Sequence, residues 1–313
     1  MDCPRIDLAR YVVVPVWYGC NNRCGICMLG PLKKILPVFD FEQYQRLLLE
    51  ARADGRRDGL ILSGGEVTTF EGLEPYVRFA ASLGCFGRIQ IQTNGRRLAD
   101  REYLEALVGW GVNEFFVSIH GRHDVHDAIT GVPGAFAELE RAMDNLEDFD
   151  VNVITNTVLT SVNAAVIASL LAWLAPRTIS EHHVWNYYPM APTDVDGRIV
   201  SLREFLARLP DWVAAVDGSG RPLVLKGFPE CLCPGPPCFI DNEFPLALLP
   251  ELFWEAFDRN RFGTCVHKHG CAAGRCWGLS AAYEAKYGDE RELLRPILST
   301  PPHAAGEGGT KSP

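Results

Sequence analysis

Apolar and polar positions along the first two thirds of the chain alternate between short strand-like runs and longer helix-like runs. The run 11–17 (YVVVPVW) is almost continuously apolar and rich in β-branched residues, which is typical of a strand buried on both faces. Further strands are predicted at 59–63, 88–92, 114–120, 151–158 and 183–188. Helical periodicity marks 41–53, 73–83, 100–108, 136–146 and 163–175, with Asp100 as a helix cap.

This order of elements predicts the fold class. Six strand–helix units in succession imply a parallel sheet with right-handed crossovers. We therefore expect an α/β fold, a partial or near-complete (β/α) TIM-type barrel spanning residues 1–200. In such barrels, functional groups gather at the carboxyl ends of the strands.

Beyond residue 200 the pattern changes. A helix at 202–216 and a strand at 221–225 are followed by a Pro- and Cys-rich stretch and then by further cysteines. We predict a C-terminal cysteine-rich extension over residues 201–298. The tail 299–313 lacks an apolar pattern and is predicted to be disordered.

Composition narrows the class of protein. The 313 residues are 47% hydrophobic, and the net charge of −9 disfavours nucleic acid as a partner. The start of the chain lacks a secretory pattern, and no apolar run is long enough to cross a bilayer. We expect a cytoplasmic protein without a membrane partner.

Cysteines supply the first chemical signal, because eleven are many for a reducing compartment, where such clusters favour metal over disulfides. Cys20, Cys24 and Cys27 follow the first strand in CxxxCxxC spacing. Three thiolates can hold three corners of a cubane iron–sulfur cluster and leave the fourth iron open to a second molecule. A structural zinc site would normally have four protein ligands.

Polar and glycine motifs follow the next strands at the same predicted rim. They are Gly64-Gly65-Glu66, Thr93-Asn94-Gly95, Ser118 to His120, and Asn156. With the cysteine motif, these features over residues 10–190 resemble the radical S-adenosylmethionine (SAM) superfamily. One departure is Val67, where the family usually has proline after the glutamate.

The resemblance implies two cofactors and a set of contacts. Cys20, Cys24 and Cys27 would bind a [4Fe-4S] cluster, and SAM would chelate its open iron. Gly64 and Gly65 would contact the methionine part of SAM, Glu66 would accept from its ammonium or orient the loop, and Ile26 would contact the adenine. Ser118 and Asn156 match positions that reach the ribose and the carboxylate. Thr93 and Asn94 complete the predicted cofactor site, although Asn-Gly is also a common turn pair.

Histidines near the fourth strand leave alternatives open. His120 stands at a strand end and is a candidate to touch substrate, or it is a buried, satisfied side chain. The segment 123–131 resembles one found in a subgroup of the superfamily, with a structural or a substrate-contact role.

A second cysteine group lies in the extension. Its spacing and the following Trp277-Gly278 resemble auxiliary-cluster regions of radical SAM enzymes. The predicted ligands are Cys265, Cys271 and Cys276, with a fourth from Cys231, Cys233 or Cys238, of which Cys231 is favoured. Structural zinc is the alternative. Two cysteines are then spare, and Cys233 or Cys238 is a candidate hydrogen donor to a substrate radical.

The resemblance implies reductive cleavage of SAM to a 5′-deoxyadenosyl radical, which abstracts hydrogen from a small-molecule substrate and leads to oxidation, epimerisation or rearrangement. A flavodoxin or ferredoxin would donate the electron. Alternatives are a peptide maturase acting with a separate recognition protein, and a non-catalytic iron–sulfur or zinc protein. Because only 19 residues precede Cys20, we do not expect a cobalamin or peptide-recognition domain there.

Overall fold

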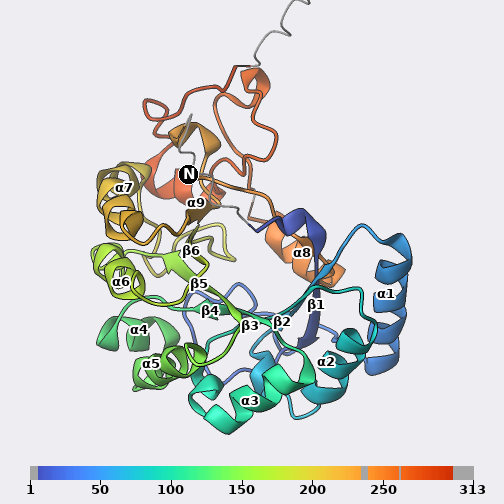
Figure 1. Ribbon diagram of the computed structural model, residues 1–313. Helices are drawn as coiled ribbons and strands as arrows, with labels where there is room; N and C mark the ends of the chain where they lie inside the picture. Colours follow the sequence, from blue (N-terminus) through green and yellow to red (C-terminus); the bar gives the residue numbers. More distant parts are fainter. Residues whose placement is uncertain (1–5, 234–238, 261, 299–313) are drawn as a thin grey trace, which may run out of the picture.

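Eight parallel strands form a single curved sheet in the computed structural model, which describes residues 6–233, 239–260 and 262–298. Their spatial order is β7-β6-β5-β4-β3-β2-β1-β8 (Figure 1). The strands are β1 (Tyr11–Trp17), β2 (Gly59–Gly64), β3 (Arg88–Thr93), β4 (Glu114–Ser118), β5 (Asn152–Leu159), β6 (Glu181–Asn186), β7 (Leu223–Lys226) and β8 (Leu246–Ala247). The predicted partial (β/α) barrel is confirmed.

Helices cover the outer face of the sheet, as Figure 1 shows for α1 to α7. Their bounds are α1 (Phe41–Asp54), α2 (Leu73–Ser82), α3 (Arg101–Trp110), α4 (His123–Thr130), α5 (Ala135–Leu146), α6 (Ile167–Leu174), α7 (Leu202–Asp217), α8 (Glu251–Asp258) and α9 (Ala281–Tyr287). Asp100 caps α3 by accepting a hydrogen bond from the Tyr103 amide, as predicted. Helix α6 begins four residues later than predicted, after a run of turns.

A short segment of the extension bridges the open side of the barrel. Ile240 pairs with Leu225 of β7, and a few residues later β8 pairs with β1 at the other edge. Lys226 fixes the segment by donating from Nζ to the carbonyl oxygens of Asp241 and Glu243, at 2.8 and 2.6 Å. The sheet remains open, but residues 239–247 run along both of its edges.

The main apolar core lies between the sheet and the helices, while part of the barrel interior is polar. Buried Glu114 accepts hydrogen bonds there from Tyr11 Oη, Gln90 Nε2 and Asn152 Nδ2. A buried carboxylate such as this one is tolerated inside a barrel because it is hydrogen-bonded. The nearly continuous apolar run of β1 is buried except at Trp17, which is half-buried.

Beyond residue 200 the structure is less regular. Helix α8 packs Phe253 and Phe257 against Tyr18, Leu32 and Leu36 of the segment after β1. The sequence analysis missed α4, α8, α9 and β8. The boundary at residue 200 stays a prediction, and β7 and β8 from beyond it join the barrel sheet. The predicted disordered tail, 299–313, lies outside the described residues.

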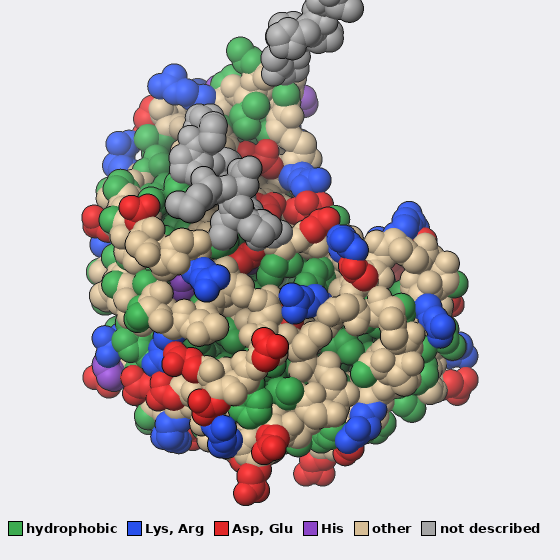
Figure 2. Space-filling view, viewed as in Figure 1, with side chains coloured by type: hydrophobic (Ala, Val, Ile, Leu, Met, Phe, Trp, Pro, Cys, Tyr) green, Lys and Arg blue, Asp and Glu red, His purple; other side chains and the backbone are tan. Residues whose placement is uncertain are grey.

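Two surface features bear on partners. No helix within the described part of the chain is long and apolar enough to cross a membrane. On the face in Figure 2, basic and acidic side chains are interspersed over the barrel.

Candidate active site

A single cavity of about 930 Å³, partly open to solvent, lies at the carboxyl ends of β1 to β6. All the barrel residues predicted for the site line it: Cys20, Cys24, Ile26, Cys27, Gly64, Gly65, Glu66, Thr93, Asn94, Ser118, His120 and Asn156. These residues are spread over more than 130 positions of the sequence, and the parallel sheet brings them together.

The two glycines hold the start of the cysteine loop against the end of β2. Gly65 donates its amide to the Trp17 carbonyl at 2.7 Å, and Glu66 donates to the Gly19 carbonyl at 2.8 Å. A Cβ on Gly64 would lie 2.0 Å from the Trp17 oxygen, and one on Gly65 would lie 2.4 Å from the Gly19 oxygen. Glycine is therefore required here for contact between two backbones, whatever ligand the cavity binds.

Asn94 and Arg96, just after β3, also hold the cysteine loop in place. The Asn94 side chain donates to Asn21 Oδ1 at 2.7 Å. Arg96 donates to the Asn21 carbonyl and to Asn22 Oδ1, and its guanidinium also pairs with Glu138 of α5. The Thr-Asn-Gly motif thus does more than turn the chain, because its asparagine anchors the cysteine loop.

Glu66 organises the loops rather than offering a free carboxylate. Its oxygens accept from the Thr68 amide and hydroxyl, the Thr93 hydroxyl and the Asn94 amide. Burial raises the pKa of Glu66, and the four hydrogen bonds oppose that rise. Of the two roles expected for Glu66, these contacts favour orientation of the loop.

Helix α4 holds the other side of the cysteine loop. Arg23 and Gly25 donate their amides to the carbonyls of Thr130 and Ile129, at 2.9 and 3.2 Å. Asp127 accepts from the amides of Gly134 and Phe136 and so fixes the start of α5. These contacts give the segment 123–131 a structural role, one of the two predicted for it.

The cavity fits a cluster with a polar ligand. Burial raises the pKa of Cys20 and Cys24, that of Cys24 to about 12, and the other two thiols of the motif add to the rise at Cys24. Three crowded thiolates need a cation to neutralise them. Asn156 Oδ1 is buried in the cavity wall without a protein hydrogen-bond partner. Because buried polar atoms are normally hydrogen-bonded, a polar ligand or a water molecule is expected beside this one.

His120 lines the cavity as a neutral side chain. Burial lowers its pKa to about 3, with a further contribution from neighbouring His126. The Val158 amide donates to His120 Nδ1 at 3.2 Å, which leaves the proton on Nε2. His120 can therefore donate a hydrogen bond but is a poor base at neutral pH.

The sequence analysis missed several lining residues, namely Asn22, Lys33, Gln92, Phe116, Val158 and Trp185. Strand alternation offered a signal for two of them, because Trp185 precedes the end of β6 and Gln92 the end of β3. Lys33 had no such signal, since it lies in an irregular segment.

The second cysteine group also comes together. Burial raises the pKa of Cys231, and Cys276, Cys265 and Cys271 each add to the rise, so these three thiols lie near Cys231. Backbone amides donate to three of the sulfurs, from His267 to Cys265, Ile297 to Cys271 and Gly278 to Cys276. Cys231 and Cys265 pack on an apolar cluster that also contacts Cys24 and Ile26.

The two candidate hydrogen donors differ. Cys233 packs against the apolar cluster of α6, α7 and β7 and is not among the residues lining the cavity. Cys238 lies outside the described residues. Within the described ranges, no group of three or more His, Cys, Asp or Glu side chains surrounds a single-ion position.

Comparison with known proteins gives the class. Residues 14–174 match the family described as the Radical SAM superfamily. This range holds the cysteine loop and the strand ends through Asn156. The chain belongs to the radical SAM superfamily.

Individual relatives are distant. Over 188 residues the chain is 28% identical to an AdoMet-dependent heme synthase of Methanosarcina barkeri, covering 59% of this chain and 52% of that protein. It is 23% identical to a 7,8-dihydro-6-hydroxymethylpterin dimethyltransferase of Methanocaldococcus jannaschii, covering 65% and 40%. The chain thus spans about half the length of the heme synthase and less of the methyltransferase.

Solved structures agree on the fold. Streptococcus suis SuiB bound to its precursor peptide SuiA superposes with a TM-score of 0.56 at 18% identity, over 70% of this chain and 49% of that one. Native anSMEcpe with bound AdoMet and Kp18Cys peptide gives a TM-score of 0.57 at 15% identity, over 68% of this chain and 63% of that one. Identities this low carry the fold alone.

Proposed function

We propose that this chain is a radical SAM enzyme that cleaves SAM reductively at a [4Fe-4S] cluster and abstracts a hydrogen atom from a small-molecule substrate. The observation that carries the proposal is the one cavity lined by three cysteines and by the ends of β2 to β5. Cluster and SAM together supply the 5′-deoxyadenosyl radical. The chain supplies binding, orientation and shielding.

Each group in the cavity then has a role. Cys20, Cys24 and Cys27 ligate the cluster, and the Gly64–Glu66 backbone and Asn94 keep their loop in place. Asn156 Oδ1 is free to accept from the ligand, and His120 Nε2 can donate to it. Ser118, Thr93 and Ile26 complete the SAM site. Phe116, Val158 and Trp185 make the far wall apolar and keep water away from a reactive intermediate.

We also propose an auxiliary [4Fe-4S] cluster on Cys231, Cys265, Cys271 and Cys276. Its support is the proximity of the four thiols and the backbone amides that donate to three of them. Hydrogen bonds to cluster sulfurs tune the reduction potential. A flavodoxin or ferredoxin in the cytoplasm remains the expected electron donor.

Peptide maturation with a separate recognition protein is the second candidate. It is motivated by the peptide-bound state of solved neighbours such as SuiB and anSMEcpe. The net reaction on either substrate class, whether oxidation, epimerisation or rearrangement, follows from chemistry after hydrogen abstraction. A non-catalytic iron–sulfur or zinc protein is the alternative of another class.

Anaerobic reconstitution tests the central proposal. Reduced protein with SAM should release 5′-deoxyadenosine, and Cys20→Ala should abolish that release. Cys85→Ala is the matched control, because Cys85 packs against the main core rather than lining the cavity. Release that survives Cys20→Ala would sink the proposal, as would a wild-type protein that binds zinc and only zinc.

A further inference from the structure

A hollow of about 650 Å³, open to solvent, lies where the cysteine loop meets α5 and the turn before α3. Helices α3 and α5 are neighbours on the outside of the sheet in Figure 1. The lining of the hollow includes Asn21 of the loop and three arginines, Arg96, Arg97 and Arg141. None of its lining residues lines the candidate SAM cavity, so the two spaces are distinct.

The cysteine loop separates this hollow from the candidate SAM cavity. Asn21 lines the hollow, whereas its neighbours Cys20 and Asn22 line the cavity. Arg96 holds this arrangement, because it donates from Nη1 to the Asn21 carbonyl at 2.7 Å and to Asn22 Oδ1 at 2.9 Å. A molecule seated in the hollow therefore touches a residue that is adjacent in sequence to Cys20, a proposed cluster ligand.

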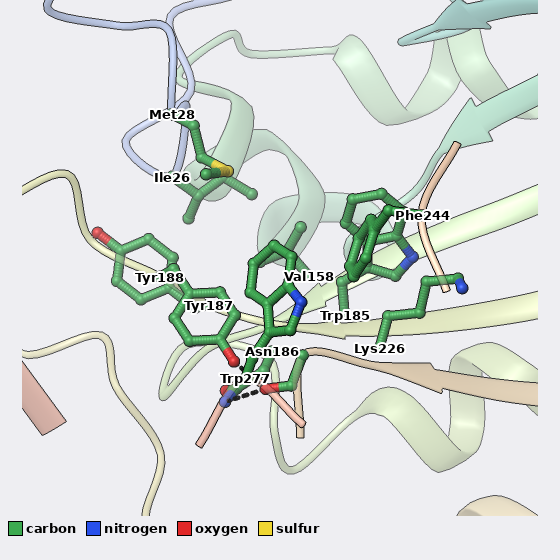
Figure 3. Close-up of a pocket in the computed structure, with 11 residues that line it drawn as sticks. Ile26, Met28, Val158, Trp185, Asn186, Tyr187, Tyr188, Lys226, Phe244 and Trp277 are labelled. Atoms are coloured by element: carbon green, nitrogen blue, oxygen red, sulfur yellow. Dashed lines mark hydrogen bonds between the residues drawn. The ribbon is translucent and has the colours of Figure 1, made fainter. Parts of the chain in front are cut away.

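The later part of the loop faces the interior of the protein instead. Ile26 and Met28 both point into a second cavity in Figure 3. The aromatic wall of that cavity is formed by Trp185, Phe244 and Trp277. Because this cavity shares lining residues with the candidate SAM cavity, it belongs to the same site. The interior side of the loop thus serves cofactor and substrate, and the hollow is accessible to a partner that stays outside.

Two arginines of the hollow have charges that no carboxylate neutralises. Arg97 and Arg141 are exposed, and neither forms an ion pair within the part of the chain that the structure describes. Arg97 lies instead over an aromatic ring of α3, 4.4 Å from the ring centroid. The carboxylates that line the hollow are engaged, since Glu138 pairs with Arg96 at 2.5 Å and Asp100 caps α3.

This positive charge contrasts with the net charge of −9 of the whole chain. Opposite charges steer two proteins together and fix their orientation, and like charges repel. An acidic protein is therefore repelled by the molecule as a whole and attracted to the hollow. Arg23 is exposed on the same loop and adds to the attraction, because its guanidinium donates to the Gly131 carbonyl rather than to a carboxylate.

We propose that the hollow is the docking site of an acidic one-electron carrier protein. This inference rests on the proposed function, which requires an electron at the rim cluster and leaves its point of entry open. One electron leaves the reduced carrier, which is oxidised by one equivalent, and reduces by one equivalent the cluster that Cys20 helps to hold. No bond forms or breaks in this step, and no proton has to move. Arg97 and Arg141 bind and orient the carrier.

Flavodoxin is the probe, and Arg97→Glu combined with Arg141→Glu is the test variant. Titration of the full chain at low salt, followed by flavin fluorescence, should show flavodoxin binding that the double variant weakens at least about tenfold. Added salt should weaken binding by the wild type much more than binding by the double variant. Arg141→Glu alone, which leaves Arg97 on its ring, should weaken binding by about threefold.

Arg52→Glu combined with Arg259→Glu is the matched control. It makes the same change of net charge at two exposed positions outside the hollow, and it should bind flavodoxin as tightly as the wild type does. A wild type that does not bind flavodoxin would overturn the docking site. Equal binding by the wild type and the Arg97/Arg141 variant would also overturn it, as would equal weakening in the control.

Release of 5′-deoxyadenosine separates this inference from the proposed function. Dithionite needs no docking site, so with SAM and dithionite the reconstituted wild type and double variant should release the product at the same rate. With reduced flavodoxin as the electron source, the double variant should need at least about tenfold more flavodoxin for the same rate. A wild type without product under dithionite sinks the proposed function, while the binding titration still decides the docking site. Product under dithionite, with equal flavodoxin dependence in the two proteins, sinks this inference alone.

Discussion

The barrel rim and the C-terminal extension both gather cysteines, but they hold them differently. At the rim, each loop is fixed by its neighbour, since β2, β3 and α4 all hydrogen-bond to the segment containing Cys20, Cys24 and Cys27. In the extension, Cys265, Cys271 and Cys276 all lie in irregular segments between helices and strands. Backbone amides donate hydrogen bonds to their sulfurs.

This difference predicts how far the effect of a substitution extends through the structure. A rim substitution should disturb the whole cysteine loop, because backbone contacts from several strands meet there. A substitution in the extension should act locally and leave the barrel folded. The following experiments test that contrast.

Gly65→Ala should have the largest effect. The added Cβ would lie 2.4 Å from the Gly19 oxygen and 2.6 Å from the Tyr18 oxygen, so backbone must move. We expect the free energy of unfolding to fall by about 3 kcal/mol and the rim cluster to be lost. Denaturant unfolding and iron analysis measure the two effects.

Gly87→Ala is the matched control, because a Cβ there meets nothing within 4 Å. It should keep both stability and iron. If Gly65→Ala binds iron as well as Gly87→Ala does, the rim loop is not held as described.

Cys276→Ser should act on the extension alone. Iron should fall from about eight to about four per chain, while the rim cluster and 5′-deoxyadenosine release persist. Iron analysis and electron paramagnetic resonance follow the two clusters separately. Cys233→Ser should keep all the iron, because Cys233 packs in a different apolar cluster from Cys231. Iron content unaffected by Cys276→Ser would refute the auxiliary ligand set.

The same contrast explains what the sequence predicted. Strands such as Tyr11–Trp17 are continuous apolar runs, and parallel connections bring their ends to one rim, so residues as distant as Cys20 and Asn156 were predicted to converge. Glu66 and Asn94 were predicted as cofactor contacts, and the structure also gives them protein partners, Thr93 and Asn94 for Glu66 and Asn21 for Asn94. Side-chain partners across loops leave no periodic trace in a sequence.

For the extension, the sequence offered no comparable pattern of apolar strands joined by parallel connections. Helix α8 starts at Glu251, after Pro250, without a side-chain cap, and β8 has two residues. Neither carries a strong local signal, and both depend on contacts with the barrel, β8 on β1 and α8 on Tyr18. The aromatic wall likewise joins Trp185 with Phe244 and Trp277 of the extension, which no spacing reveals.

Acid should weaken the barrel before the extension. Burial lowers the pKa of His120 to about 3, and of His126 and His182 to about 4 each. The folded state keeps these rings neutral, whereas the unfolded chain protonates them near pH 6.5. Stability is therefore full above pH 6.5 and falls as the pH drops towards 4, by about 2 kcal/mol per ring at pH 5.

His126→Gln should reduce the loss of stability between pH 7 and pH 5 by the contribution of one ring. Urea midpoints at the two pH values measure that loss. His123→Asn is the control, since His123 is exposed and asparagine suits its positive φ of 47°. Equal slopes in wild type and His126→Gln would show that His126 is not held neutral in the folded barrel.

Asp100→Ala should have the smallest effect and tests the barrel's local signals. Asp100 accepts from the Tyr103 amide at 3.2 Å and so caps α3, a contact that α8 lacks at its own start. Losing the cap should cost about 1 kcal/mol in the free energy of unfolding and leave iron content unchanged. Asp150→Ala, at an exposed position before β5, controls for the loss of a surface carboxylate and should cost less. Equal losses in the two variants would mean that the cap, although predicted from sequence, adds nothing that packing of α3 against the sheet does not already provide.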